Sequence, residues 1–525
     1  MDKIKENVIS KHLLYTMYFI ILMIIDWTRG SQAGAIWAWT INMTGVIMAL
    51  ILFSAYSLEE FLKPIYMIYS GIGVLALIIA YCWWMSHQAA IFRDQLLTAI
   101  LNIWLLGIFV IKIYLDVVIY ETKKLQFCKT EILAAVMLIL MLISVNEDIW
   151  PIWYLVIFGL FYHTEYSKEE MKALKRGMLD GIIASFFVLQ GAAFVFRPYD
   201  VARYAGIYSN CNMNALFYGI VWIAFLIRLY DIRKKKEKKW KEVLCFLFVG
   251  VLTVFSLMTG CRTAWIAMFI AGLFYIIFAD FHGLQYKAGK IFKKLIAYLL
   301  VICIGVPITF ACVRYIPPIF HHPIWYDWEY NIDRVHSFDP WDSDKYVSWE
   351  TFSEEMISRI EPFIRLILGN EQIGIATVEA SSFTIGDATY DISSEEYADY
   401  GSVLARVAFW EYYIKNGNIK GHLGAEGHEI QGVNFYIWHT QNIFVQFWYY
   451  YGIPVAILFL GVMILLIFAG MKKMLKGQED VLVCLLYLTF FGVFGMAEAV
   501  WYPGQMILFL AFFTPKFMQQ SEKKV

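Results

Sequence analysis

Charged side chains are scarce in this sequence. Asp, Glu, Lys and Arg make up 17% of the 525 residues, whereas soluble globular domains carry about 25%. Apolar residues reach 60%, compared with about 45–50% in such domains. This composition argues against an ordinary soluble protein and favours lipid as the solvent for much of the chain. The net charge of -1 gives no information about nucleic-acid binding.

Patterns typical of metal or disulfide frameworks are also missing. The eight cysteines contain no CxxC pair, so they indicate neither a zinc site nor a stapled secreted module. Half of them (Cys82, Cys245, Cys303 and Cys484) lie inside apolar runs, where a thiol behaves as a small hydrophobe. The acidic stretch 339–350 fails the spacing of a calcium loop. We therefore expect no metal and no other cofactor.

Long apolar runs recur from end to end. They centre near residues 20, 45, 75, 108, 138, 156, 187, 220, 251, 271, 305, 455, 490 and 510. A spanning helix needs about 20 mostly apolar residues, and backbone groups cannot stay unpaired in hydrocarbon. The runs predict an all-α polytopic membrane protein with about 14 transmembrane helices.

Basic residues indicate the orientation, because short cytoplasmic loops hold the excess of Lys and Arg. With the N-terminus inside, this count places every basic cluster on the cytoplasmic side: 121–130, 164–176, 233–239, 287–294, 472–476 and the tail at 523–524. Basic clusters can also bind nucleic acid or anionic lipid. Beside spans, the topological interpretation is favoured, so no nucleic-acid partner is expected.

One long stretch departs from this pattern. The predicted organisation is helices 1–11 over residues 1–315, an extracytoplasmic loop over 316–440, and helices 12–14 with a cytoplasmic tail over 441–525. The loop carries 20 acidic against 7 basic residues, opposite to the cytoplasmic segments. Within it, apolar spacing predicts short helices over 354–368 and 402–416. The first lies either on the membrane surface or in a packed loop domain.

Four polar segments fall at the outer face of this topology. Residues 203–215 begin with Arg203 and contain Asn210 and Asn212, which suit hydrogen bonding to a ligand or a simple capped turn. Residues 259–265 place Arg262 in a tight outward turn, where arginine either serves a function or snorkels to the interface.

The third and fourth segments lie in and after the loop. Arg406 and Trp410 share a helical face ahead of Gly421, Gly424 and Gly427, and loop flexibility is the alternative explanation for these glycines. Residues 438–446 place His439 at the mouth of a span, where imidazole can accept a proton, although a lone histidine is more often structural. Glu498 occupies the last outward turn.

In this order the segments resemble the O-antigen ligase/polymerase superfamily. The resemblance rests on Gly206–Asn212, Arg262, Arg406–Trp410, Gly421 with Gly424, His439 and Gly452. It implies a lipid-embedded, metal-independent glycosyltransferase of the bacterial cytoplasmic membrane that uses a polyprenyl-diphosphate-linked glycan. The implied partners are that donor, a glycan acceptor, membrane lipid and other envelope polysaccharide assembly proteins.

The residue types suit this chemistry. Guanidinium forks bind the diphosphate as negative charge develops, which assigns Arg262 and Arg406 to catalysis and Arg203 to binding. His439 is the expected base for the acceptor hydroxyl, and Glu498 orients it or shares that task. The substrate-binding set further contains Asn210, Asn212 and Trp410, the last by stacking on a sugar.

Several alternatives stay open. Polymerisation is preferred over ligation to another acceptor, and a flippase or transporter for the same lipid-linked glycan is the rival class. A transporter should carry ionisable residues near the bilayer midplane, and the spans are nearly free of charge. Cys211 and Cys261 both lie at the outer face, where two free thiols are favoured over a disulfide.

Overall fold

The computed structural model describes residues 2–31, 37–87, 90–146, 148–200, 202–323, 337–368, 380–385, 388–393, 410–423, 428–430, 435–437, 440–498, 500 and 504–519. Helices dominate these residues. Each of the fourteen apolar-run centres falls inside a helix. The apolar runs of the sequence therefore located these helices correctly.

The α-helices are bounded as follows: α1 Asp2–Ser31, α2 Trp37–Phe53, α3 Pro64–His87, α4 Ala90–Tyr114, α5 Lys129–Leu142, α6 Trp150–His163, α7 Lys168–Phe196, α8 Cys211–Lys235, α9 Lys239–Met258, α10 Arg262–Phe274, α11 Ala288–Phe320, α12 Trp349–Leu368, α14 Ile443–Gln446, α15 Ile453–Leu475, α16 Leu482–Gly495, α17 Met506–Phe513 and α18 Lys516–Gln519. Shorter turns are η1 Leu58–Phe61 and η5 Glu479–Val481, of 3-10 type, and η2 Leu115–Ile119, η3 Tyr275–Gly283 and η4 Phe447–Tyr451, of π type.

Eight helices in the described part are long and apolar enough to cross a membrane. Others, such as α5 and α6, have 14 residues and cover about 21 Å at 1.5 Å per residue, less than the roughly 30 Å hydrocarbon core. The polytopic, helical membrane class is thus confirmed. The expected number of about 14 spans exceeds the eight described helices that are both long and apolar enough, because several apolar runs form helices that are too short.

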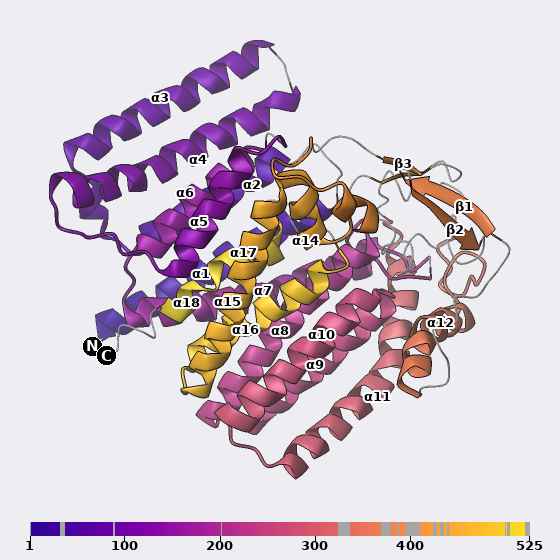
Figure 1. Cartoon of the computed structure of the whole chain (residues 1–525). Helices are drawn as coiled ribbons and strands as arrows, with labels where there is room; N and C mark the ends of the chain where they lie inside the picture. The colour runs from indigo at the N-terminus through magenta and orange to yellow at the C-terminus, as the bar shows by residue number, and fades with distance from the viewer. Residues whose placement is uncertain are drawn as a thin grey trace.

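The helices differ sharply in how much protein surrounds them. Of the 18 most apolar consecutive residues of α8, 89% are buried, whereas the corresponding share in α3 is 11%. In Figure 1 α8 lies in the middle of the bundle, and both views show α3 and α4 projecting from it as a hairpin. Apolar side chains around the whole circumference of α8 therefore form the core, and those of α3 are left for lipid.

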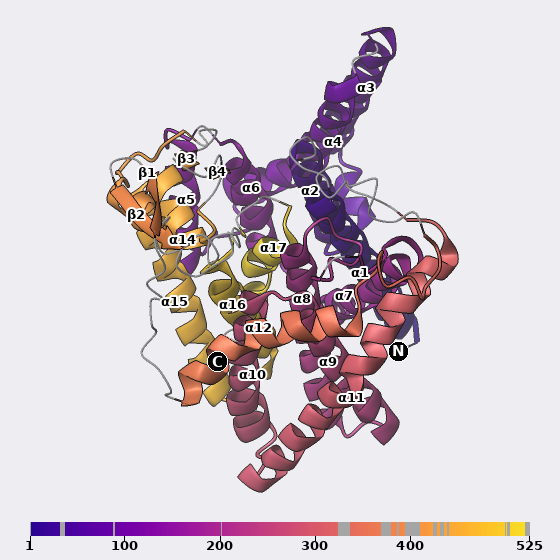
Figure 2. The same cartoon turned by 90° about the vertical axis from the view of Figure 1, so that its right-hand side faces the viewer.

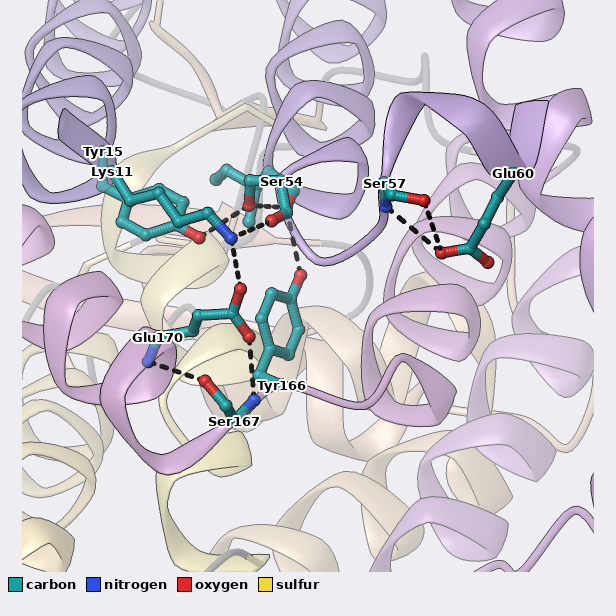
Figure 3. A network of polar contacts seen from close by, with 9 residues as sticks. Lys11, Tyr15, Ser54, Ser57, Glu60, Tyr166, Ser167 and Glu170 are labelled. Carbon is teal, nitrogen blue, oxygen red and sulfur yellow. Dashed lines mark hydrogen bonds and ion pairs between the residues drawn. The ribbon is translucent and has the colours of Figure 1, made fainter. Parts of the chain in front are cut away.

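One end of the bundle gathers the basic turns. Lys11 of α1 donates to the Ser54 carbonyl (2.8 Å) and pairs with Glu170 at the start of α7 (Figure 3). Further contacts at this end join Lys175 to Asp480, Lys234 to Glu479, Lys473 to the Met518 carbonyl and Lys516 to the Thr164 carbonyl. We call this the basic end. The basic clusters thus share a location in the bundle as well as a positive charge.

The opposite end carries the loop between α11 and α15 (Figure 1). Helix α12 begins five residues before the predicted 354–368 helix, packs Phe352 on Phe310 of α11 (ring centroids 5.1 Å apart) and crosses the bundle in Figure 2. Of the predicted 402–416 helix, residues 410–415 are described and helical. We call this the outer end.

The loop also contains strands, which the sequence did not indicate. β1 (Ala380–Ile385) pairs antiparallel with β2 (Ala388–Ser393), and β3 (His428–Ile430) pairs antiparallel with β4 (Phe435–Ile437). The prediction of short helices alone in the loop was therefore incomplete. Segments of three to six residues carry too few apolar positions to show a period of two.

Candidate functional site

The turn between α9 and α10 is the centre of the candidate site. Gly260 adopts a positive φ of 63°, which allows the chain to reverse within three residues. The Thr259 hydroxyl accepts from the Cys261 amide (3.2 Å) and donates to the Ser256 carbonyl (2.7 Å). These bonds hold the turn tightly and make Arg262 the first residue of α10.

Arg203 joins this turn to the start of α8. Its Nε donates to the Thr259 carbonyl (2.9 Å), and its Nη2 donates to Oδ1 of Asn212 (2.6 Å). The Nδ2 group of Asn212 in turn donates to Oε1 of Glu498 (2.9 Å). Glu498 is 8% exposed. One amide therefore bridges a cation and a nearly buried carboxylate that lie 295 positions apart in the sequence.

A further arginine, Arg359 of α12, reaches the same turn, and the sequence analysis missed it. Its Nη1 donates to the Gly260 carbonyl (3.3 Å), and it also pairs with Glu355 one helical turn earlier. A Cβ atom placed on Gly260 would lie 3.0 Å from Nε of Arg359 and 3.2 Å from Nε of Arg203. Two guanidinium groups thus approach the turn where glycine leaves room.

Two hydrogen bonds hold the segment before α8 in place. Buried Arg197 donates to the Gly206 carbonyl (2.7 Å), and the Trp27 indole donates to the Ile207 carbonyl (3.1 Å). Asn210 is the N-cap of α8, and its side-chain oxygen accepts from the Asn212 amide (2.7 Å). The capping alternative considered for Asn210 is therefore realised in the structure.

Helix termini add to the positive potential. The N-termini of α8 and α10 meet here, because Arg203 bonds to residues next to both. Neither first turn contains an acidic residue, although the partial positive charge at a helix N-terminus favours anions. Arg262 is a cation at such an N-terminus and opposes the dipole. This combination indicates a site suited to an anion.

The fourth polar segment lies beside Glu498 in the chain's fold. Asn442 caps α14 and donates from Nδ2 to the Met496 carbonyl (2.8 Å), two residues before Glu498. The fully buried Thr440 accepts at its carbonyl from the Trp410 indole (2.9 Å). Trp410 is therefore held by the segment that follows His439. His439 itself and Arg406 lie outside the described residues.

No protein-family model, curated protein or solved structure matches this chain. Among the described residues, no group of three His, Cys, Asp or Glu side chains is arranged to hold a metal ion. All eight cysteines lie in described segments and are free, including Cys211 and Cys261.

Cys261 is a poor nucleophile in this setting. Burial raises the pKa of its thiol to about 12, and the nearby Glu498 carboxylate adds to the effect. Since the thiolate is the reactive form, the cysteine beside Arg262 is a packing residue. The polar groups that the described residues gather at this turn are the guanidiniums, the Asn212 amide and the Glu498 carboxylate.

Proposed function

We propose that this chain is a membrane glycosyltransferase that polymerises polyprenyl-diphosphate-linked glycan repeat units at the outer leaflet of the cytoplasmic membrane. The single observation that carries the proposal is the group of Arg203, Arg359 and Arg262 around the Gly260 turn, beside the buried Glu498. This group lies at the end of the bundle opposite the basic turns.

The arrangement suits a diphosphate leaving group. As the glycosidic bond breaks, negative charge develops on the diphosphate, and guanidinium forks and helix N-termini stabilise it. In a related setting, the loss of one such positioned donor raises the activation free energy by about 2.7–4 kcal/mol. In this proposal Arg203 and Arg262 hold the diphosphate, and Arg359 brings α12 over it.

The acceptor hydroxyl requires a base close to the same place. His439 is the proposed base, with Glu498 to orient it or to share its task. The tether from Asn442 to the Met496 carbonyl supports this pairing, because it holds the residues after His439 next to the turn that contains Glu498. In the proposal Arg406 supplies a further cation, and Trp410 lines the acceptor path.

The proposed topology places the basic end in the cytoplasm and the outer end outside, with both termini cytoplasmic and about 14 membrane-embedded helices. Positive charge in short turns favours this orientation. Ligation to another acceptor is the alternative within the same chemistry. Transport receives less support, because the buried ionic group formed by Arg233, Asp280 and Lys294 lies near helix ends at the basic end rather than at the midplane.

A transfer assay tests the proposal. The purified protein in nanodiscs is given a polyprenyl-diphosphate-linked oligosaccharide, and products are resolved by chain length. We expect longer glycans from the unaltered protein, loss of product with Arg262→Ala or His439→Ala, and unchanged product with Arg176→Ala, an exposed arginine of the basic end. Full activity in both site variants contradicts the site, and translocation of the lipid without glycosidic bond formation contradicts the transferase.

A further inference from the structure

A cavity lies at the basic end, far from the candidate site. It is partly open, has a volume of about 90 Å³, and is enclosed by α8, α9, α10, η3 and α11. Most of its wall is apolar, with Leu226, Phe246, Val249, Ile276 and Leu295 among the lining residues. A water molecule requires about 10–15 Å³ of such volume, so the cavity has room for several groups of the size of a water molecule.

Charged residues close one end of this cavity. The side chain of Arg233 is 4% exposed and donates from Nε to Glu242 (3.1 Å), while its Nη1 lies 3.5 Å from Oδ1 of Asp280. Lys294 lies 3.9 Å from the same Asp280 oxygen. The ammonium groups of Lys294 and Lys290 also lie over the ring of Tyr286, at 3.8 and 3.5 Å. Glu242 also pairs with the exposed Lys239 (2.8 Å), so Arg233, Lys294 and Lys239 pair with two carboxylates and Lys290 adds a fourth cation nearby. Positive charge is therefore in excess within this group.

The group is also incompletely hydrogen-bonded. The buried Nζ of Lys294 and Oδ1 of Asp280 have no hydrogen-bond partner among the described residues. Burying a charged group without hydrogen bonds is costly, and the ion-pair distances of 3.5 and 3.9 Å are too long to replace them. An anionic ligand with oxygen acceptors would satisfy the ammonium group and neutralise the excess charge.

The shape of the cavity identifies the kind of anion. Its lining on α8 extends from Arg233 near the helix end to Trp222, about 16 Å further into the bundle at 1.5 Å per residue. Polar groups thus lie at the depth of the head groups and apolar groups deeper in the hydrocarbon. The neighbouring helix α11 is mostly exposed, with 17% of its most apolar window buried, so lipid has access to the opening.

We infer that this cavity binds an anionic phospholipid from the leaflet at the basic end. Its phosphodiester contacts the ammonium of Lys294, and part of one acyl chain enters the space between α8, η3 and α11. Basic pockets between membrane helices on the cytoplasmic side are suited to such head groups. The inference is independent of the glycosyltransferase proposal, because it concerns the other end of the molecule.

Native mass spectrometry of the full chain from nanodiscs tests this inference. With mixed phosphatidylglycerol and phosphatidylcholine, we expect one retained phosphatidylglycerol in the unaltered protein and about fivefold weaker retention in Lys294→Met, since one lysine near anionic lipid contributes about that factor. Lys293→Met removes an exposed neighbour outside the cavity and should retain lipid as the unaltered protein does. Equal retention of both lipids, or a preference that survives Lys294→Met, overturns the inference.

A second variant tests the inference independently if Lys294→Met misfolds. Gly272 lines the cavity, and a Cβ there would meet Trp222 at an ordinary 3.5 Å. Gly272→Leu should therefore fill the cavity without altering charge, and it should displace phosphatidylglycerol while the protein keeps its elution volume. Undiminished lipid retention in this variant also overturns the inference. If inorganic phosphate in detergent raises the melting temperature as much as phosphatidylglycerol does, the lipid assignment is wrong.

Discussion

The two ends of the bundle use arginine in opposite ways. At the basic end Arg233 is enclosed by the carboxylates of Glu242 and Asp280, so its charge serves the packing of α8, α9 and η3. At the outer end Arg203 is held by a backbone carbonyl and a side-chain amide. Neutral acceptors position a guanidinium without cancelling its charge. Arg233 is thus paired with carboxylates, whereas the hydrogen bonds that hold Arg203 come from uncharged groups.

The largest expected effect is on stability at the basic end. Arg233→Met should lower the free energy of unfolding by about 3–5 kcal/mol, because it removes the nearer of the two cations that face the buried Asp280 carboxylate. Lys239→Met is the matched control: Lys239 pairs with the same Glu242 (2.8 Å) but is 80% exposed, so its change should stay within about 0.5 kcal/mol. Denaturation followed by tryptophan fluorescence measures both, and equal effects would remove the distinction between buried and exposed partners.

The next effect is on turnover at the outer end. Arg203→Ala should lower kcat for glycan transfer about 10²–10³-fold, because a positioned donor to the developing charge is lost. Arg228→Ala is its control, since Arg228 pairs with Asp180 at the basic end (3.6 Å), and should leave turnover unchanged. Thermal unfolding of both variants is recorded alongside. A loss of turnover that merely follows a loss of stability would assign Arg203 to the fold instead.

The smallest effect concerns the ion pair at the basic end between buried Lys175 and the largely exposed Asp480. Burial opposes the charge of Asp480, but Lys175 (2.9 Å), with Lys172 and Lys234 nearby, holds the pKa of its carboxyl below the ordinary value. A depressed pKa in the folded state stabilises the fold above the unfolded pKa of about 3.9, and this contribution is lost as the pH falls through the folded pKa.

Asp480→Asn should therefore cost less than about 1 kcal/mol at neutral pH, because the Asp480 side chain is 63% exposed and water weakens its pair with Lys175. The difference from the unaltered protein should shrink in high salt and vanish at acidic pH. Unfolding curves at several pH values and salt concentrations measure it. A difference that persists below pH 3 would show that the aspartate acts through packing and not through its charge.

The sequence predicted the helices well because their signal is local. Every apolar run became a helix. Spans and helices are not the same, however: the runs centred near residues 138 and 156 formed helices of 14 residues each, shorter than a spanning helix needs. The helix over 354–368 was predicted from its apolar positions, and their spacing carries no information about the role of Arg359 on the same helix.

The site was predicted only in part because its contacts are distant in sequence. Arg203, Asn212 and Glu498 were each proposed from local motifs, but nothing local shows that one amide joins them. The bond from Arg359 to Gly260 links positions 99 residues apart, and no spacing rule covers that distance. In the same way, the sequence shows Asp280 only as an acidic residue near the end of a span. The packing of α8 and α11 beside it brings Arg233 and Lys294 to its carboxylate.

The bend at Gly260 has a consequence for how the outer end tolerates change. Its dihedral angle excludes most side chains, and the space above it is where Arg203 and Arg359 approach each other. Adding one methyl group would strain the chain and push both arginines outward, with no charge altered anywhere. The most neutral substitution in the vicinity is thus among the most disruptive, since this end depends on an empty volume as much as on its cations.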